Sequence, residues 1–352
     1  MKARPVVYAL LSALLFGVST PAAKALLGLT DPAILAGLLY CGAGLGAMGL
    51  RRVMRSLSAD GTQQAPLSRA DLPWLGGAIV AGGIVGPLLL MFGLTRTEAG
   101  TASLMLTLEG VATALMAWFV FHENFDRRIA LGMACLVAGA AVLSWSGQPT
   151  LATAIGPLAI VGACVAWGLD NNLTRKVSLA DPLQIVQLKG LIAGPCNIAL
   201  GLWMGGTLPA PLSVGVAGLV GLLGYGASLA LFVLALRHLG TARTGAYFST
   251  APFFGATAAV LALGEPVTTQ LLVAAGLMAV GVWLHITEHH EHLHAHDPME
   301  HEHAHGHDEH HRHDHGPMDP AGEPHSHRHR HAPLEHAHHH MPDEHHRHRH
   351  EG

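Results

Sequence analysis

The chain is dominated by apolar segments of about the length that crosses a lipid bilayer. A crossing takes roughly 20 helical residues, because each residue advances the helix by about 1.5 Å through about 30 Å of hydrocarbon. Charged residues make up only 12% of the chain, against about 25% in an ordinary soluble domain. We therefore predict an all-α polytopic membrane protein with ten transmembrane helices, near residues 5–28, 31–50, 73–94, 100–121, 128–147, 153–176, 181–204, 211–236, 241–263 and 267–286.

The first five segments and the last five repeat the same landmarks in the same order. The matching pairs are Phe16-Gly17 with Trp167-Gly168, Lys24 with Arg175, Asp31-Pro32 with Asp181-Pro182, Gly100-Thr101-Ala102 with Gly240-Thr241-Ala242, and Glu123 with Glu265. A unit with an odd number of spans must insert upside down relative to its copy, as in many secondary transporters. The sequence therefore predicts two inverted five-helix repeats, at residues 1–147 and 153–286, followed by a tail at residues 287–352.

Basic residues in the short loops predict the orientation of the helices. With the N-terminus in the cytoplasm, most of these residues, including Arg51, Arg52 and Arg128, fall on the cytoplasmic side. Only Lys24 and Arg96 lie near the outer ends of the spans. Lys and Arg concentrate in the cytoplasmic loops of membrane proteins. We therefore expect a multi-pass protein of the bacterial inner membrane with both termini in the cytoplasm.

Three ionisable side chains fall well within the predicted spans: Glu109 in the fourth, Asp170 in the sixth and Lys189 in the seventh. A charge that faces lipid is costly, so such residues face a bundle interior or an aqueous cavity and are candidates for function. Asp170 or Glu109 could pair with Lys189 across the bundle. The pair would either fix helix packing or supply a carboxylate that takes up a proton or ion during transport.

Neutral polar and aromatic residues near these charges extend the candidate site. Asn171 and Asn172 add amide groups directly after Asp170, and Tyr247 and Ser249 lie together in the ninth span. Hydroxyl groups in membrane helices also bond to their own backbone or to a neighbouring helix, and a tryptophan there can serve packing. The predicted substrate site consists of Asp170, Asn171, Asn172, Lys189, Glu109, Trp167, Tyr247 and Ser249.

The tail contains all but three of the 28 histidines and almost no aliphatic residues. Such a composition cannot bury a core, so the tail is expected to be disordered. Neutral imidazole binds Zn, Ni, Co and Cu, and we expect a transition-metal ion to bind at His292, His294, His296, His301, His303, His305, His307, His325, His327, His329 and His331. The alternative is a solvated tail that becomes cationic in mild acid, since His titrates at about 6.5.

The repeated landmarks resemble EamA-type members of the drug/metabolite transporter superfamily. The likeness extends over nearly all of residues 1–286 and rests on Phe16-Gly17 to Lys24, Trp167-Gly168 to Arg175, the two Gly-Thr-Ala motifs and the terminal Glu123 and Glu265. The resemblance implies a ten-helix inner-membrane carrier, often an exporter of small metabolites that is driven by an ion gradient. Glu109 and the histidine-rich tail depart from the common pattern of the family.

Three functions follow from these features. The first is a secondary transporter that exports small organic metabolites or drugs and has a metal-binding regulatory or storage tail. The alternative is a transporter of a divalent transition metal (Ni, Co or Zn) or of its complex, although the core offers no histidine in the pathway. In the third, the membrane portion only anchors a metal buffer. No enzyme site can be assembled, no cofactor is required, and the expected partners are a solute, the bilayer and transition-metal ions, without nucleic acid.

Overall fold

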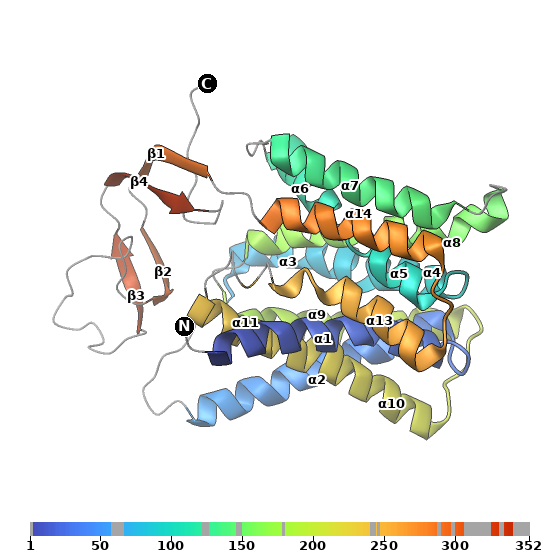
Figure 1. Ribbon diagram of the computed structural model, residues 1–352. Helices are drawn as coiled ribbons and strands as arrows, with labels where there is room; N and C mark the ends of the chain where they lie inside the picture. Colours follow the sequence, from blue (N-terminus) through green and yellow to red (C-terminus); the bar gives the residue numbers. More distant parts are fainter. Residues whose placement is uncertain are drawn as a thin grey trace.

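The computed structural model is a bundle of helices that lie side by side, with short strands at one end (Figure 1). It describes residues 3–57, 67–121, 127–145, 150–177, 180–239, 244, 247–286, 290–296, 300–305, 325–330 and 334–340. The first part contains α1 (Ala3–Leu26), α2 (Pro32–Leu57), the 3-10 helix η1 (Arg69–Asp71), α3 (Leu72–Ala78), the π-helix η2 (Ile79–Val85), α4 (Gly86–Leu94), α5 (Ala99–Met105), α6 (Leu108–Phe121) and α7 (Arg127–Ser144). The second part contains α8 (Leu151–Arg175), α9 (Pro182–Trp203), α10 (Pro211–Gly221), the π-helix η3 (Leu222–Ala227), α11 (Ser228–Leu239), α13 (Ala251–Leu263) and α14 (Thr269–Ile286).

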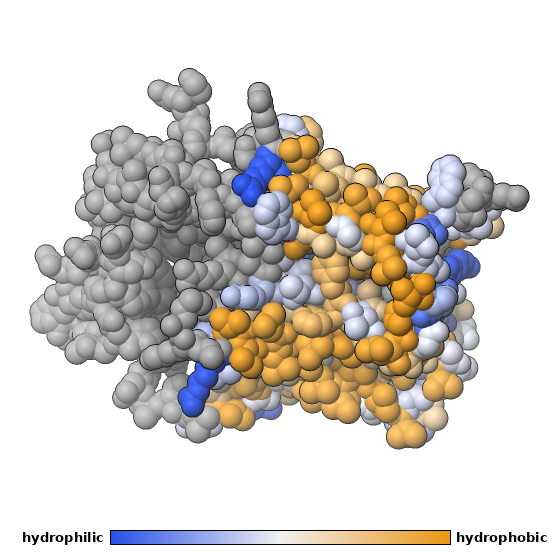
Figure 2. Space-filling view, viewed as in Figure 1, coloured by the Kyte–Doolittle hydropathy of each residue, from blue (hydrophilic) through white to orange (hydrophobic). Residues whose placement is uncertain are grey.

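Helices of membrane-crossing length and apolarity make up most of this bundle. Within the described residues there are seven of them: Arg4–Leu26, Pro32–Met54, Leu72–Leu94, Ala99–Met116, Ala152–Thr174, Pro182–Trp203 and Pro211–Ala235. Three shorter apolar helices cover Arg128–Ser144, Ala251–Leu263 and Thr269–Leu284. Apolar side chains cover the helical surface in the face that Figure 2 shows. The protein is therefore a multi-pass membrane protein, and described helix lies in each of the ten segments predicted from the sequence.

Helices α2 and α9 pack antiparallel along their whole length, with glycine at the points of contact. A Cβ atom on Gly37 would lie 2.6 Å from the Gly194 carbonyl oxygen, and one on Gly44 would lie 2.9 Å from the Gly190 carbonyl carbon. Small residues of this kind allow helix backbones to approach closely in a membrane. At the far end of α2, Arg51 Nε lies 2.6 Å from the Asp181 carboxylate that precedes α9.

The first helix of each half, α1 or α8, contacts helices of the opposite half. Helix α1 packs against α13, α11 and η3, whereas α8 packs against α6, α4 and η2. Glycine allows the close approach in both cases: a Cβ on Gly17 would lie 2.2 Å from the Ala251 carbonyl oxygen, and one on Gly168 would lie 2.9 Å from Thr113 N. Helices α7 and α14 lie beside each other at the edge of the bundle (Figure 1). The first helix of each half thus packs against helices of the other half.

Four spans are irregular at their middle, in two corresponding pairs. The π-helices η2 and η3 interrupt the spans α3–α4 and α10–α11. The helix that begins at Ala99 breaks at Leu106 and Thr107, where Thr107 Oγ1 donates to the Leu104 carbonyl at 2.8 Å. Before α13 the same pattern recurs, with Thr250 Oγ1 donating to the Tyr247 carbonyl at 2.6 Å. Irregular backbone at membrane depth is tolerated only where protein or an aqueous cavity surrounds it.

The landmark residues have structural roles where they are described. Asp31 Oδ1 accepts from Ala33 N at 3.0 Å, and Asp181 Oδ1 accepts from Leu183 N at 3.0 Å, so both aspartates cap the helix that follows. Glu265 accepts from Ala99 N at 2.6 Å and from Gly100 N at 2.7 Å, and so caps α5. Glu123 and the motif Gly240-Thr241-Ala242 lie outside the described residues.

The described residues of the tail form four short strands, and the disorder expected of residues 287–352 as a whole stays a prediction. Strand β1 (His290–His296) pairs antiparallel with β4 (Leu334–His340), and β2 (Glu300–His305) pairs antiparallel with β3 (His325–Arg330). Histidine alternates with other residues through most of these strands, which matches the two-residue period of extended chain. Backbone pairing thus gives these strands regular structure without the apolar core that the composition excludes.

Candidate functional site

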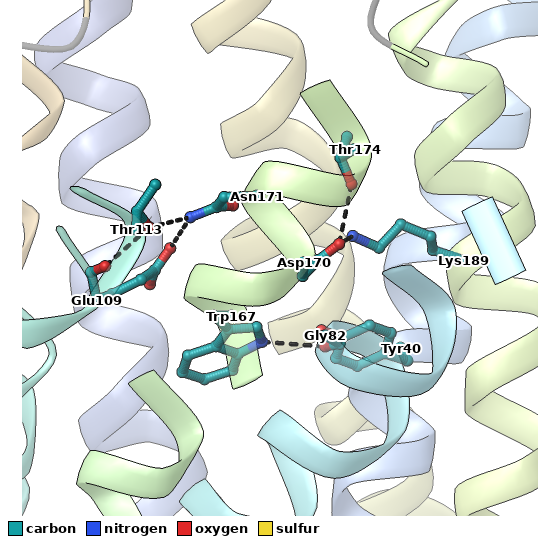
Figure 3. A network of polar contacts seen from close by, with 9 residues as sticks. All are labelled: Tyr40, Gly82, Glu109, Thr113, Trp167, Asp170, Asn171, Thr174 and Lys189. Atoms are coloured by element: carbon teal, nitrogen blue, oxygen red, sulfur yellow. Dashed lines mark hydrogen bonds and ion pairs between the residues drawn. The ribbon is translucent and has the colours of Figure 1, made fainter. Parts of the chain in front are cut away.

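A buried ion pair between α8 and α9 is the centre of the candidate site. Lys189 Nζ lies 2.6 Å from both carboxylate oxygens of Asp170, and Thr174 Oγ1 donates to Asp170 Oδ1 at 2.9 Å (Figure 3). Only 15% of the lysine side chain and 8% of the aspartate side chain are exposed. Lys189 stands seven residues after the start of α9, which is roughly 10 Å along the helix. The sequence left two partners open for Lys189, and the structure selects Asp170.

On the other side of α8, Asn171 connects to Glu109 of α6. Asn171 Nδ2 donates to Glu109 Oε1 at 2.9 Å and to Thr113 Oγ1 at 3.1 Å. Figure 3 shows Asn171 pointing toward Glu109 and away from the ion pair. Asn172 is buried, and its amide donates to the backbone carbonyls of Gly168 at 2.8 Å and Thr113 at 3.2 Å. Asn172 therefore ties α8 to α6, whereas Asn171 and Glu109 form a contact between side chains.

The π-helix η2 supplies backbone carbonyls to the same region. The Gly82 carbonyl accepts from Trp167 Nε1 at 3.0 Å and from the Tyr40 hydroxyl at 2.5 Å. The Gly83 carbonyl accepts from the buried amide of Asn197 at 2.9 Å. A π-turn leaves carbonyls without their usual helical partners, and buried carbonyls need donors. Side chains from three other helices supply these donors and hold η2 in place.

Glycine at position 82 is required by the ion pair. A Cβ atom there would lie 1.9 Å from Asp170 Oδ2, a distance at which the carboxylate would have to move. The sequence shows Gly82 only as part of a small-residue packing pattern with Gly86. The structure gives it a second role, because the absent side chain makes room for the charged group.

Aromatic rings form a continuous row beside these polar groups. Tyr40 contacts Tyr225 at 6.0 Å between ring centroids with the rings tilted, Tyr225 meets Phe16 edge-on at 5.6 Å, and Phe16 contacts Phe248 at 5.4 Å. Phe248 in turn contacts Phe232 at 5.0 Å. The row runs from α2 through η3 and α1 to the segment before α13, so it joins both halves of the bundle.

The candidate residues from the sequence separate into two groups in the structure. The polar network contains Asp170, Lys189, Asn171, Glu109 and Trp167, with Asn172 beside it. Tyr247 and Ser249 lie instead at the break before α13, where both are half-buried. The polar groups that sequence reasoning did not select are Tyr40, Thr113, Thr174 and Asn197. Asn197 could have been found, since an amide within an apolar span needs a partner.

The predicted metal ligands belong to the tail. Of these histidines, His307 and His331 lie outside the described residues, and the others stand in strands β1 to β3. Within the part of the chain that the structure describes, no group of three or more His, Cys, Asp or Glu side chains could hold a metal ion. Metal binding by the tail therefore stays a prediction.

Comparison with known proteins gives three kinds of match. A family model described as "EamA-like transporter family" matches residues 3–145 and 154–287. An uncharacterized transporter of Methanothermobacter thermautotrophicus is 26% identical over 283 residues, which cover 76% of this chain and 82% of that protein. A probable 4-amino-4-deoxy-L-arabinose-phosphoundecaprenol flippase subunit ArnE of Pseudomonas paraeruginosa is 40% identical over 111 residues, or 31% of this chain and 92% of that protein. A solved crystal structure has a TM-score of 0.58 at 16% identity and covers 79% of this chain and 95% of its own, a likeness of fold alone.

Proposed function

Because the chain belongs to the EamA-like transporter family, we propose that it is a secondary transporter that exports small organic metabolites or drugs across the inner membrane. In this proposal ten helices form two inverted five-helix repeats, residues 1–147 and 153–286, and both termini lie in the cytoplasm. The family model matches twice, once in each of these regions. The antiparallel seam of α2 and α9 and the matching contacts of α1 and α8 support the inverted arrangement.

The buried ion pair of Asp170 and Lys189 carries this proposal. Two charges within the membrane are expensive to keep, and their mutual attraction only offsets part of the desolvation cost. Asp170 stands against the irregular backbone of η2, and Glu109 follows the break between α5 and α6. Discontinuous helices at the interface of two repeats are where secondary transporters bind their substrates. The pathway therefore passes the groups that surround Asp170, Lys189 and Glu109.

Transport assays on charge variants test this pathway. Asp170→Asn and Lys189→Ala are each expected to abolish efflux of a panel of amino acids, amines and dyes from cells that express the protein. The control is Asp71→Asn, which makes the same chemical change at η1, outside the apolar part of the bundle. Membrane abundance of every variant is measured on the same samples. Efflux retained in both interior variants would remove the proposed pathway.

The tail is proposed to bind metal in a regulatory or storage role. A chain that ends at residue 289 should keep its efflux and its thermal stability in detergent, because the described tail strands pair with one another. Equilibrium dialysis of full-length and shortened protein against Zn, Ni, Co and Cu measures the role of the tail. Equal metal binding by the two chains would contradict it.

Transport of a divalent transition metal is the second candidate, and the histidine-rich tail is the observation that favours it. It predicts that cells expressing the protein differ in nickel, cobalt or zinc from cells that carry Asp170→Asn. Elemental analysis of both cell types measures the difference. An unchanged metal content would exclude this function and leave the organic solute.

A further inference from the structure

Glu109 is the carboxylate of the site that carries an unbalanced charge. Both oxygens of Asp170 contact Lys189 Nζ, whereas the donor to Glu109 Oε1 is the neutral amide of Asn171. Among the residues that the structure describes, no Lys or Arg forms an ion pair with Glu109. With Asp170, Lys189 and Glu109 all ionised, the network therefore has one excess negative charge. A buried excess charge is costly, so the ionised form of Glu109 favours a cation beside it.

Space for such a cation lies beside Glu109. Gly110 is exposed, and a Cβ atom on it would meet nothing within 4 Å. Gly110 is roughly 180° around α6 from Phe119, at about 100° per residue, and Phe119 is 64% exposed on the outside of the bundle. Accessible surface therefore lies next to Glu109, on the face of α6 opposite Phe119.

Helix α8 also has accessible surface on the side of Glu109. Val165 and Leu169 are exposed and mark the face of α8 that is turned to lipid. Asn171 is also exposed, yet it lies roughly 200° around the helix from Leu169. Its exposed amide therefore faces the interior, on the side where it contacts Glu109. Two helices independently place accessible surface around this carboxylate.

Aromatic surface accompanies the charge. Trp167, four residues before Asn171 on α8, shares the Gly82 carbonyl with Tyr40. Tyr40 begins the row of rings that continues through Tyr225 to Phe16 and Phe248. Aromatic faces attract cations, most of all weakly hydrated organic ones. An anionic solute would meet the excess negative charge and be repelled.

The ligand set also argues against a divalent metal at this position. Calcium takes about six to eight oxygen ligands and transition metals prefer His or Cys. Among the described residues, the side chains hydrogen-bonded around the Glu109 carboxylate are the Asn171 amide and, through it, the Thr113 hydroxyl. One carboxylate beside neutral groups and aromatic rings matches a single positive charge on an apolar body.

We infer that Glu109 is the substrate-recognition carboxylate and that the site takes small organic monocations, such as protonated or quaternary amines with an apolar group. The inference rests on the proposed transport function and specifies its substrate class. Asp170 and Lys189 then keep each other neutral near the site, and Glu109 alone sets the charge of the solute.

Binding to the full-length protein in lipid nanodiscs tests this assignment with benzyltrimethylammonium as the probe. The permanent charge of this probe does not change with pH, and neopentylbenzene provides the same shape without the charge. We expect Glu109→Gln to weaken binding of the cation at least about tenfold and to leave binding of the neutral compound unchanged. Glu109→Asp should recover part of the affinity. The matched control is Glu98→Gln, which removes the same charge from an exposed position at the start of α5.

The pH dependence gives an independent measurement. A proton and the probe would compete for Glu109, so the affinity of the wild-type protein should fall as pH falls, whereas that of Glu109→Gln should stay constant. Five other ionisable groups interact electrostatically with Glu109: Asp170, Lys189, Tyr40, Tyr225 and Cys164. A pH dependence that persists in Glu109→Gln would assign the titration to one of these groups and overturn the inference.

The outcomes separate this inference from the proposed function. If wild type and Glu109→Gln bind the probe equally, or if wild type does not bind it, the recognition of cations is refuted, while efflux that depends on Asp170 still supports transport. If binding requires Glu109 but no solute is exported in a manner that depends on Asp170 or Lys189, the cation site stands and the transport proposal fails.

Discussion

The two halves of the bundle share their backbone architecture and differ in their polar chemistry. In each half the first helix approaches a neighbouring helix through glycine, at Gly17 in α1 and at Gly168 in α8. Two residues later, Ser19 in α1 lies against Gly224 of η3, and Asp170 in α8 lies against Gly82 of η2. The same helix position thus carries a hydroxyl in one half and a charge in the other.

Two further positions show the same contrast. Lys189 stands eight residues after Asp181, and the position eight residues after Asp31 is Leu39, which is buried. Glu109 stands two residues after the break at Thr107, and Pro252 stands two residues after the break at Thr250. In the proposed repeats, the matched positions therefore supply the scaffold, and the unmatched ones supply the charges. Each half can serve as the reference for the other.

The largest effect is expected from replacing Lys189 by its counterpart from the first half. Lys189→Leu leaves Asp170 buried without its cation, which should cost about 3–5 kcal/mol of stability and abolish transport. Thermal unfolding in detergent measures the loss. The double variant Asp170→Ser/Lys189→Leu gives the second half the residues of the first. We expect it to regain most of the stability but none of the transport, and a double variant that transports would refute the role of the ion pair.

Glycine at the π-helices gives the next comparison. Gly82→Ala places a Cβ atom 1.9 Å from Asp170 Oδ2, whereas Gly224→Ala places one 2.5 Å from Ser19 Cβ. Overpacking typically costs about 1–3 kcal/mol, and on that scale we expect about 3 kcal/mol for Gly82→Ala and about 1 kcal/mol for Gly224→Ala. The control is Gly276→Ala in α14, where nothing lies within 4 Å. Equal melting temperatures for the first two variants would contradict the crowding at Asp170.

The contacts of α1 and α8 should differ less. A Cβ on Gly17 would lie 2.2 Å from a backbone oxygen of α13, and one on Gly168 would lie 2.9 Å from Ala112 Cβ and Thr113 N. Neither neighbour can rotate away, and the approach at Gly17 is the closer one, so Gly17→Ala is expected to cost about 2 kcal/mol and Gly168→Ala about 1 kcal/mol. Unfolding of both variants in the same detergent tests the order, and the reverse order would count against the close approach of α1 to α13.

The smallest difference concerns the two capping aspartates. Asp31→Ala removes a helix cap, which typically costs about 1 kcal/mol. Asp181→Ala removes a cap and also the ion pair with Arg51. The Asp181 side chain is 12% exposed and the Arg51 side chain is 17% exposed. Asp181→Ala should therefore cost about 0.5–1 kcal/mol more. The double variant Arg51→Ala/Asp181→Ala serves as the test, since it should be no less stable than Asp181→Ala if the ion pair accounts for the difference.

Several features of the site could be predicted from the sequence because they follow from local rules. Asp170, Lys189 and Glu109 are charged residues within apolar segments, and such residues are costly unless they face the interior. Asn171 and Trp167 were found through their place beside Asp170. Thr113 and Thr174 could not be singled out, because hydroxyl groups in membrane helices usually bond to their own backbone.

Other features depend on which helices meet. Tyr40 donates to Gly82 from a different helix, and Asn197 donates to Gly83 from a third. The sequence contains no signal that these residues share a target, since the free carbonyls arise only when η2 adopts its π-turn. Composition also gives no signal for the pairing of the described tail strands, because backbone pairing needs no apolar side chains.

Length, apolarity and spacing are properties of single segments, so the amino-acid sequence was enough to predict a membrane chain of long apolar helices with matched landmarks in two halves. It also identified the charges that required an explanation. The partners of those charges emerged only from the packed helices, in which Lys189 pairs with Asp170 and leaves Glu109 to Asn171. The reason is physical: an ion pair is fixed by distances of a few ångströms across helices, and those distances exist only after the helices have packed.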